Sequence, residues 1–229
     1  MIRRDMISET HLIDCMEFMR TLPDKFFDLC VTDPPYGVNL EYGVYHDTIE
    51  NWYDLMDRFI PEIKRVCQMA IFPSCSINKM GWLYKNHPPD WLICWYKGSP
   101  GHSAYVGFND WEPLLVYGKI KGVSMHDYMF VQNGEKMGSH GHPCPKPVQF
   151  FKTIYKRVNV PIQRVVDPFM GSQSSRIAAY QLGFDYWGCE LDPDYYRDGC
   201  KRFDAVIHKK DTTEYVPVEQ TGVGQARLF

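Results

Sequence analysis

Short runs of apolar residues recur along the chain, and each is bounded by charged or turn-forming residues. Apolar runs of roughly four to eight residues are typical of strands that are buried on both faces of a sheet. Leu29, Cys30 and Val31 form such a run between Asp28 and Asp33. The pattern predicts seven strands, at His11–Asp14, Asp28–Thr32, Met69–Phe72, Trp91–Tyr96, Leu114–Tyr117, Gln163–Asp167 and Tyr186–Glu190.

Between these runs, apolar residues recur at the three- and four-residue spacing of an amphipathic helix. The spacing predicts helices from Trp52 to Ile63, from Val148 to Val158 and from Ile177 to Leu182. Strands that alternate with helices in this way are typical of α/β proteins. We therefore predict an α/β fold with a doubly wound, seven-stranded, mostly parallel sheet. Ligands bind such sheets at the carboxyl ends of the strands, so the residues that follow each strand are the first candidates for chemistry.

The length of the chain predicts one catalytic domain. Its 229 residues suffice for one sizeable core, which we place at residues 1–208. Within this domain, residues 98–141 are rich in Gly, His, Ser and aromatic residues and lack a regular spacing, so we predict mostly loops there. Residues 209–229 are predicted to form a polar C-terminal tail.

The composition is that of an ordinary folded protein. Apolar residues make up 45% of the chain and charged residues 23%, which excludes a disordered chain. The N-terminus is polar, and no run approaches the ~18 apolar residues of a membrane span, so we expect a cytoplasmic protein without a membrane partner. The cysteines include no Cys-x-x-Cys pair and several lie in apolar runs, which indicates reduced, buried thiols.

Charge is distributed unevenly along the chain. The net charge of −3 does not indicate a nucleic-acid partner, but the segment between Glu135 and Asp167 contains no acidic residue. A basic segment of this kind either contacts phosphates or forms a solvated helix face. Its basic residues are Lys136, Lys146, Lys152, Lys156, Arg157 and Arg164.

The first candidate site is the loop Asp33-Pro34-Pro35-Tyr36, which directly follows a predicted strand. Two prolines stiffen the backbone and remove two N–H donors, so the loop presents a carboxylate, carbonyl oxygens and an aromatic face. The carboxylate of Asp33 and the carbonyl of Pro34 can hold the two N–H groups of an exocyclic base amine, while Tyr36 stacks on the base. Paired acceptors favour the tetrahedral, cationic nitrogen that forms when such an amine attacks a methyl group. The alternative is a stiff turn that Asp33 merely caps.

The second candidate site follows the strand that ends at Asp167. Gly171 allows the backbone to approach a ligand closely, and the hydroxyl and N–H groups around Ser172 suit a carboxylate. Phe169 is placed to cover an adenosine. Glu190 follows the next strand, where an acidic residue commonly binds ribose hydroxyls. The two segments together predict a nucleoside site, whereas a Gly-Ser turn on its own is more often structural.

Taken together, these residues resemble the DNA amino-methyltransferases of the circularly permuted beta class. In that class the Asp-Pro-Pro-Tyr loop precedes the Phe-x-Gly loop, as it does here. Three further segments are similar to family segments, and the resemblance covers the chain from about Leu12 to Phe203. These segments are residues 12–16, which resemble the adenine-contacting segment, 111–117, which resemble the strand that walls the base pocket, and 142–147, which resemble the cofactor-side segment.

The resemblance implies a Rossmann-like methyltransferase fold, S-adenosyl-L-methionine as cofactor, double-stranded DNA as substrate, and a bacterial or phage-infected host cell. It implies that Asp33, Pro34, Pro35 and Tyr36 form the catalytic loop. The target base would be flipped out of the duplex to reach this loop. The residues that the resemblance places around the cofactor are Asp14, Lys146, Asp167, Phe169, Gly171, Ser172 and Glu190.

Two departures from the family pattern matter. Gln173 stands where the family usually has a second glycine, so we expect a reshaped cofactor loop or a reduced cofactor affinity. The family also usually inserts a long target-recognition region, whereas little beyond residues 118–141 is available here. We therefore expect a short or relaxed target site, or a homodimer that completes DNA contact; a monomer is the alternative.

The identity of the acceptor base is left with alternatives. The family's adenine enzymes more often begin the loop with Asp and its cytosine enzymes with Ser, so Asp33 favours the N6 amine of adenine. The alternatives are the N4 amine of cytosine and a catalytically inactive DNA-binding relative, for which Gln173 is the only indication. An RNA or protein-glutamine methyltransferase is disfavoured because the latter usually begins the loop with Asn.

Three further hypotheses concern segments outside the two loops. The aromatic residues after Tyr36 either close on a flipped base or simply pack in the protein. We expect no metal site at His140, His142 and Cys144, since no fourth ligand has suitable spacing. The C-terminal Gln225-Ala226-Arg227-Leu228-Phe229 resembles the peptide that binds bacterial sliding clamps, so Gln225, Leu228 and Phe229 are candidate clamp contacts. The aromatic residues in question are Tyr42, Tyr45, His46 and Trp52.

Overall fold

The computed structural model describes residues 6–73, 77–98, 103–104, 107–132 and 142–211. Within this part of the chain, eight strands form one sheet in the order β1-β10-β9-β2-β3-β7-β4-β8, and β5 (Ser103–Ala104) and β6 (Gly107–Phe108) form a small separate hairpin. The eight strands are β1 Ser8–Leu12, β2 Phe27–Val31, β3 Cys67–Pro73, β4 Trp91–Tyr96, β7 Trp111–Gly118, β8 Tyr128–Phe130, β9 Arg164–Asp167 and β10 Asp185–Glu190.

The large sheet is parallel except for β7. Strands β1, β10, β9, β2 and β3 pair in parallel, and β7 then runs antiparallel to both of its neighbours, β3 and β4. At the far edge, β8 pairs in parallel with β4. Because β7 is reversed, it begins at the edge where the other strands end, and Trp111 at its start pairs with Tyr96 at the end of β4.

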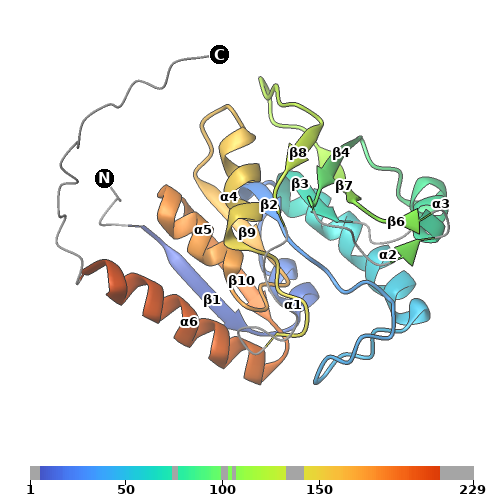
Figure 1. Cartoon of the computed structure of the whole chain (residues 1–229). Helices are drawn as coiled ribbons and strands as arrows, with labels where there is room; N and C mark the ends of the chain where they lie inside the picture. Colours follow the sequence, from blue (N-terminus) through green and yellow to red (C-terminus); the bar gives the residue numbers. More distant parts are fainter. Residues whose placement is uncertain (1–5, 74–76, 99–102, 105–106, 133–141, 212–229) are drawn as a thin grey trace, which may run out of the picture.

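Helices cover both faces of the sheet, as Figure 1 shows: α4 (Val148–Arg157), α5 (Ser174–Leu182) and α6 (Pro193–Asp211) lie in front of it, and α1 (Cys15–Arg20) and α2 (Ile49–Val66) lie behind. Two separate cores result. One contains the apolar residues of α1 and α2 and the other contains those of α4 and α5. Strands with a core on each face are continuously apolar, which explains the runs that predicted them.

The predicted α/β class and the mostly parallel, doubly wound sheet are confirmed. The sheet has eight strands because residues 128–130, which lie in a region predicted to be mostly loops, form β8. Three residues are too few for a periodic signal. The first strand was placed too late: β1 ends at Leu12, and Asp14 instead caps α1, where its carboxylate accepts hydrogen bonds from the N–H groups of Met16 and Glu17. Helix α6 reaches Asp211, beyond the expected start of the tail.

Strands β2 and β9 are neighbours in the sheet, and the chain leaves them in opposite directions. From β2 it continues through α2 to β3, whereas from β9 it continues through α5 to β10 on the other side. This reversal opens a crevice at the carboxyl ends of β2 and β9, which is where α/β proteins bind ligands. The two candidate loops therefore face each other across the crevice.

Two smaller findings bear on the environment of the protein. In the described ranges, no helix is both long and apolar enough to cross a membrane. The cysteines that the structure describes are all free thiols, and several of them are buried in the core.

Candidate active site

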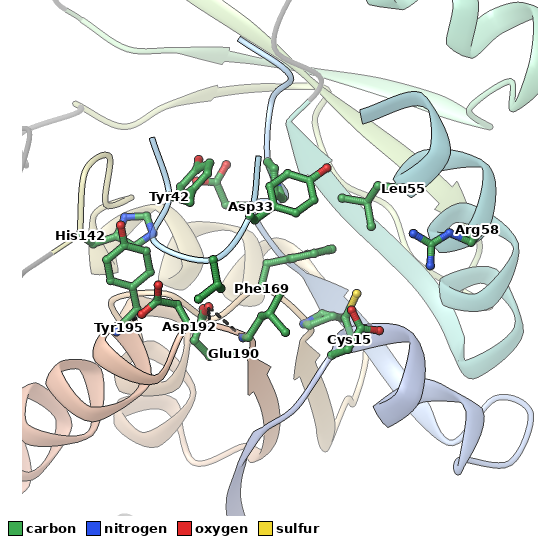
Figure 2. Close-up of a pocket in the computed structure, with 16 residues that line it drawn as sticks. Cys15, Asp33, Tyr42, Leu55, Arg58, His142, Phe169, Glu190, Asp192 and Tyr195 are labelled. Atoms are coloured by element: carbon green, nitrogen blue, oxygen red, sulfur yellow. Dashed lines mark hydrogen bonds between the residues drawn. The ribbon is translucent and has the colours of Figure 1, made fainter. Parts of the chain in front are cut away.

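A cavity opens between the two loops, and Asp33, Phe169 and Glu190 all line it. Figure 2 shows Tyr42, His142 and Tyr195 gathered at one end of the cavity and Leu55 and Arg58 at the other, with Phe169 between the two groups. A second, smaller cavity continues from the first and shares Asp33, His142 and Phe169 with it. Residues from both candidate loops therefore line the same cavity.

The turn between β9 and α5 brings the backbone close to this cavity. Gly171 has a φ of 43°, and a Cβ at this position would lie 2.8 Å from Nε2 of His142. A side chain here would be strained and would press on the His142 ring, so the position favours glycine. The N–H of Gly171 donates a 2.9 Å hydrogen bond to Oε2 of Glu190, whose Oε1 accepts from the N–H groups of Leu191 and Asp192. The Glu190 carboxylate thus fixes the turn as well as lining the cavity.

Asp167 anchors the same turn from below. Its carboxylate is buried and accepts hydrogen bonds from the hydroxyl of Thr32 at 2.5 Å and from the N–H of Phe169 at 3.0 Å. Burial raises the pKa of Asp167 to about 6. Thr32 directly follows β2, so this hydrogen bond ties the start of the catalytic loop to the cofactor loop.

Gln173 occupies the position where the family usually has a second glycine, and it keeps a glycine-like backbone with a φ of 59°. Its buried side chain turns away from both cavities. The amide nitrogen donates to Sγ of Cys200 at 3.2 Å, and the amide oxygen accepts from Arg176 at 2.9 Å. Gly199 of α6 leaves room for the side chain, because a Cβ there would lie 2.7 Å from Gln173. Gln173 therefore lines neither cavity, and the reshaped cofactor loop or reduced cofactor affinity stays a prediction.

The residues around the two cavities fit S-adenosyl-L-methionine. Phe169 lines the larger cavity together with Asp14 and Glu190, and an aromatic ring with two carboxylates suits an adenosine with its ribose hydroxyls. The smaller cavity is lined by Gly171 and Ser172 next to the start of α5, where unpaired N–H groups suit a carboxylate. From α6, Arg202 holds this end by donating to the carbonyl and hydroxyl of Ser172 and to the hydroxyl of Ser174.

The catalytic loop is held by charged side chains from outside it. Lys79 of α3 (Ile77–Asn86) is buried and donates to the carbonyl oxygens of Tyr36 and Gly37. The buried carboxylate of Asp47 accepts from the N–H groups of Gly37 at 2.5 Å, Val38 at 3.0 Å and Leu40 at 3.3 Å. No sequence signal pointed to Lys79 or Asp47.

Asp33 and Tyr36 are linked to two buried charged residues. The hydroxyl of Tyr36 lies 2.9 Å from Oδ1 of Asp33 and 2.9 Å from Oε1 of Glu112. Nζ of Lys146 donates to Oδ2 of Asp33 at 3.0 Å and to the Tyr36 hydroxyl at 2.9 Å. Lys146 was expected beside the cofactor; it does line the smaller cavity, but its hydrogen bonds go to the catalytic loop. Pro34 is buried and Pro35 lines the larger cavity.

His142 was considered only as a metal ligand and as part of a family segment, yet it lines both cavities. Its Nδ1 accepts a hydrogen bond from the N–H of Cys144, and its ring centroid lies 4.9 Å from that of Tyr195. Burial lowers the pKa of His142 to about 4, so the ring is neutral at neutral pH. Tyr42 lines the larger cavity at the same end, and burial raises its pKa above the ordinary value.

The remaining predicted residues have mixed placements. Tyr45 lines the larger cavity, whereas Trp52 is packed in the core and His46 is exposed. In the described ranges, His142 and Cys144 belong to no group of three or more residues that could hold a metal ion. Lys136, His140 and the tail residues Gln225, Leu228 and Phe229 lie outside the described residues.

Comparison with known families identifies the chain. The model of the N6_N4_Mtase family, described as DNA methylase, matches residues 85–201, just over half of the chain. The chain belongs to this family of DNA methylases. Because the match begins at residue 85, the assignment does not depend on the catalytic loop at residues 33–36. S-adenosyl-L-methionine, the cofactor expected from the sequence, is confirmed by membership of this family, whose enzymes depend on it.

Relatives and solved structures agree with this assignment. YubD of Escherichia coli (strain K12), named as a methylase, is 26% identical over 211 residues, covering 84% of this chain and 88% of YubD. The DNA adenine methyltransferase YhdJ of the same organism is 23% identical, covering 85% of this chain and 82% of YhdJ.

Two solved structures show the same fold. The M1.HpyAVI–SAM complex has a TM-score of 0.62 at 20% identity and covers 86% of this chain and 98% of that chain. The cytosine-N4-specific PvuII DNA methyltransferase has a TM-score of 0.61 at 14% identity and covers 89% of this chain and 93% of that chain. At these identities the likeness describes the fold and not the acceptor base.

Proposed function

We propose that this chain transfers a methyl group from S-adenosyl-L-methionine to the N6 amine of adenine in double-stranded DNA. One observation carries the proposal: Asp33 and Phe169 follow neighbouring parallel strands and line the same cavity. An acceptor held by the first loop and a nucleoside held by the second would meet there. The order of the loops in the chain supports the circularly permuted beta class.

On the acceptor side, the catalytic loop would bind and orient the amine. The carboxylate of Asp33 and the carbonyl of Pro34 would accept its two N–H groups, and the ring of Tyr36 would stack on the base. The amine lone pair is conjugated into the base, and two acceptors on the N–H groups draw it out of the ring plane. The nitrogen becomes cationic as its bond to the methyl carbon forms, and the negative charge of Asp33 stabilises that cation.

On the cofactor side, S-adenosyl-L-methionine supplies an electrophilic methyl group when bound. Asp14, Phe169 and Glu190 would hold its adenosine, because they line the larger cavity. Gly171 and Ser172 would hold its methionyl end, because they line the smaller one together with Asp167. Asp167 would act by holding the turn, since its carboxylate already accepts hydrogen bonds from Thr32 and Phe169.

The choice of adenine over cytosine rests on the first residue of the loop. Asp33 stands where cytosine-amine enzymes of the family more often have Ser, and the relative YhdJ is named as a DNA adenine methyltransferase. Cytosine N4 is the second candidate, because the same paired acceptors would hold its amine and the PvuII enzyme shares the fold. Gln173, the only indication of an inactive relative, leaves both cavities open.

The proposal also concerns how DNA is engaged. A base inside a duplex cannot reach the cavity, so the target nucleotide would be flipped out. The short region between residues 98 and 141 supports a short or relaxed target sequence. Assembly as a homodimer and binding of a sliding clamp by the C-terminal tail stay predictions.

The test is to express the chain, its Asp33→Ala variant and the control Asp204→Ala in cells that lack adenine and cytosine-N4 methylation of their own. Asp204 is exposed on α6, far along the chain from either loop. We expect mass spectrometry of digested DNA to show N6-methyladenine with the intact chain and the control, and a loss of at least about 1,000-fold with Asp33→Ala. Detection of N4-methylcytosine instead would identify cytosine as the acceptor base. Unmodified DNA with the intact chain would contradict the DNA-methylating function.

A further inference from the structure

Four polar side chains meet beside the catalytic loop: Asp33, Tyr36, Glu112 and Lys146. Their three hydrogen-bonded links to the Tyr36 hydroxyl are each 2.9 Å long, and the link between Lys146 and Asp33 is 3.0 Å. The residues come from three separate parts of the fold. Asp33 and Tyr36 follow β2, Glu112 lies in β7, and Lys146 precedes α4.

From this geometry we propose that Lys146 and Glu112 are positioning residues for methyl transfer, which act as a charge-balanced pair that keeps the Asp33 carboxylate oriented toward the acceptor amine. The inference rests on the proposed function and assigns Lys146 to the acceptor half of the site. Its experiment includes a measurement that needs no DNA methylation.

Burial makes the charges of this cluster interdependent. The side chain of Lys146 is 5% exposed and that of Asp33 is 18% exposed, and Glu112 is 8% exposed as a residue. A buried charge is stable only when it is paired, so removing the cation leaves two carboxylates that share one phenol. With both carboxylates ionised and Lys146 protonated, the cluster carries one net negative charge, which is the charge that complements a cationic amine.

Lys146 stays protonated in this setting. Burial alone would lower its pKa, but the nearby carboxylates of Asp33 and Glu112 outweigh the burial and raise the pKa above the ordinary value. The ammonium also lies 4.8 Å from the centre of the Tyr36 ring and 6.0 Å from that of Trp95, so aromatic faces help to hold the charge.

The hydroxyl of Tyr36 couples the two carboxylates. It has a single proton to donate and two carboxylate oxygens within 2.9 Å, while Lys146 donates to the same oxygen. When the phenol donates to Glu112, Oδ1 of Asp33 is released as an acceptor. An incoming amine could then bind Oδ1 without displacing Lys146, which remains on Oδ2.

Other titratable groups also face Asp33, and none of them replaces Lys146. His142 is neutral at neutral pH, since burial lowers its pKa to about 4. Tyr42 and Cys144 feel the charge of Asp33, but burial raises the pKa of both, so they stay neutral. Asp167 is the remaining neighbour, and its carboxylate is bound to Thr32 and Phe169.

The alternative role for Lys146 is direct binding of the cofactor carboxylate, since it lines the smaller cavity. The two roles predict different results for Lys146→Met. A cofactor ligand would raise the Kd for S-adenosyl-L-methionine at least about tenfold, whereas a positioning residue would leave this Kd within about threefold and lower kcat instead. Isothermal titration calorimetry measures the cofactor Kd in the absence of DNA.

A double-mutant cycle tests the charge balance. Lys146→Met leaves the cluster with a charge of −2, and we expect kcat/KM on DNA to fall about 100-fold or more at pH 7.5. The acid limb of the pH profile of kcat/KM should move at least about one pH unit higher in Lys146→Met, because an opposite charge within hydrogen-bonding distance shifts the pKa of a carboxylate by about that amount or more. Adding Glu112→Gln restores the net charge of −1, so the double variant should be at least about tenfold more active than Lys146→Met alone.

Controls keep the outcomes distinct. Lys85→Met changes an exposed lysine on α3, outside the basic segment, and should leave kcat/KM and the cofactor Kd unchanged. Thermal unfolding of each variant checks that it folds. Additive losses of kcat/KM in the double variant, or an unshifted acid limb of the pH profile of Lys146→Met, would overturn the charge-balanced pair. A tenfold higher Kd for S-adenosyl-L-methionine would instead assign Lys146 to the cofactor site. If the intact chain methylates no DNA, the proposed function is contradicted. The calorimetry still tests the role of Lys146 in that case, because a tenfold higher Kd for the cofactor in Lys146→Met would by itself refute this inference.

Discussion

The catalytic loop and the cofactor loop lie side by side, and they differ in which backbone groups are held next to their functional residues. The cofactor loop is fixed mainly by carboxylates that accept from its backbone N–H groups, with Asp167 on Phe169 and Glu190 on Gly171. At the catalytic loop, the buried ammonium of Lys79 donates to the carbonyl oxygens of Tyr36 and Gly37. The Asp47 carboxylate accepts from N–H groups only from Gly37 onward, after the two prolines.

The difference follows from what each backbone offers. Pro34 and Pro35 have no N–H groups, so this part of the catalytic loop offers only carbonyl oxygens. The carbonyl oxygens of Tyr36 and Gly37 that follow accept from the Lys79 ammonium. The cofactor loop leads into the start of α5, where N–H groups are unpaired and acceptors are needed. The comparison teaches that the charge of the supporting residues can be inferred from the backbone groups that a loop leaves open.

The largest effect is expected from removing the lysine that supports the catalytic loop. Lys79→Met leaves the carbonyl oxygens of Tyr36 and Gly37 without their buried donor, so we expect a loss of about 3 kcal/mol in the free energy of unfolding. The looser loop should lower kcat about 100-fold and leave the Kd for S-adenosyl-L-methionine within about threefold. Denaturant unfolding and calorimetry measure these quantities. The matched control is Lys85→Met, an exposed lysine of the same helix. A Kd for S-adenosyl-L-methionine that rises as much as kcat falls would show that Lys79 also supports the cofactor loop.

A smaller effect concerns His142, which lies between the loops. Because burial lowers its pKa from 6.5 to about 4, the unfolded chain takes up a proton in this window that the folded chain does not. Its contribution to stability is therefore complete above pH 6.5 and is lost as the pH falls toward 4. Replacing it with Asn should reduce the loss of stability between pH 7 and pH 4.5 by about 2 kcal/mol, with some allowance for solvent at the half-buried ring.

The pH series for His142→Asn is measured by urea unfolding, with His208→Asn on α6 as the exposed control. Asp167 acts in the opposite direction, because burial raises its pKa to about 6 and the folded chain therefore binds its proton first. Its contribution is present below pH 3.8 and is lost as the pH rises through about 6. Since Asp167 is present in every variant, its contribution cancels in the comparison. Identical pH slopes for the intact chain and His142→Asn would show that the imidazole is not held neutral.

The smallest effect is expected at Gln173. Gln173→Gly relieves the strain of a left-handed backbone conformation, which costs about 1 kcal/mol for a residue with a side chain, and it also removes the hydrogen bonds to Cys200 and Arg176. The two effects on stability oppose each other. We expect the free energy of unfolding to change by less than about 1 kcal/mol and the cofactor Kd by less than about threefold. Gln173→Ala keeps the strained backbone and should be about 1 kcal/mol less stable than Gln173→Gly. A tenfold gain in cofactor affinity with Gly would mean that the glutamine does distort the loop.

Much of the fold was predictable because strands buried on both faces leave continuous apolar runs. Trp91–Tyr96 was predicted with its observed bounds. The strand at residues 128–130 was missed because only Met129 faces the core, at 1% exposed, while Tyr128 and Phe130 are more than half exposed. Helices α1, α3 and α6 were also missed. Helix α1 has only six residues, which is too short for a helical period to emerge.

The candidate site was predictable where a functional side chain lies at the end of a strand or directly after it. Asp33, Asp167 and Glu190 each come at or just after a strand end, and all three lie at the cavities. The residues that support the loops were not predictable, since Lys79 is 43 positions from the carbonyl of Tyr36 and Glu112 is 76 positions from its hydroxyl. Lys146 was identified as a site residue, but its partners become visible only when three distant segments are folded together.

The reversed direction of β7 has a consequence for how this enzyme can acquire new targets. Because Tyr96 at the end of β4 pairs with Trp111 at the start of β7, the connection between them leaves from and returns to the edge where Asp33 lies. Insertions between these two positions lengthen a loop at the active-site edge without altering the register of the sheet. We therefore predict that exchanging this segment changes which sequences are methylated, while the strand pairing that carries Glu112 is preserved.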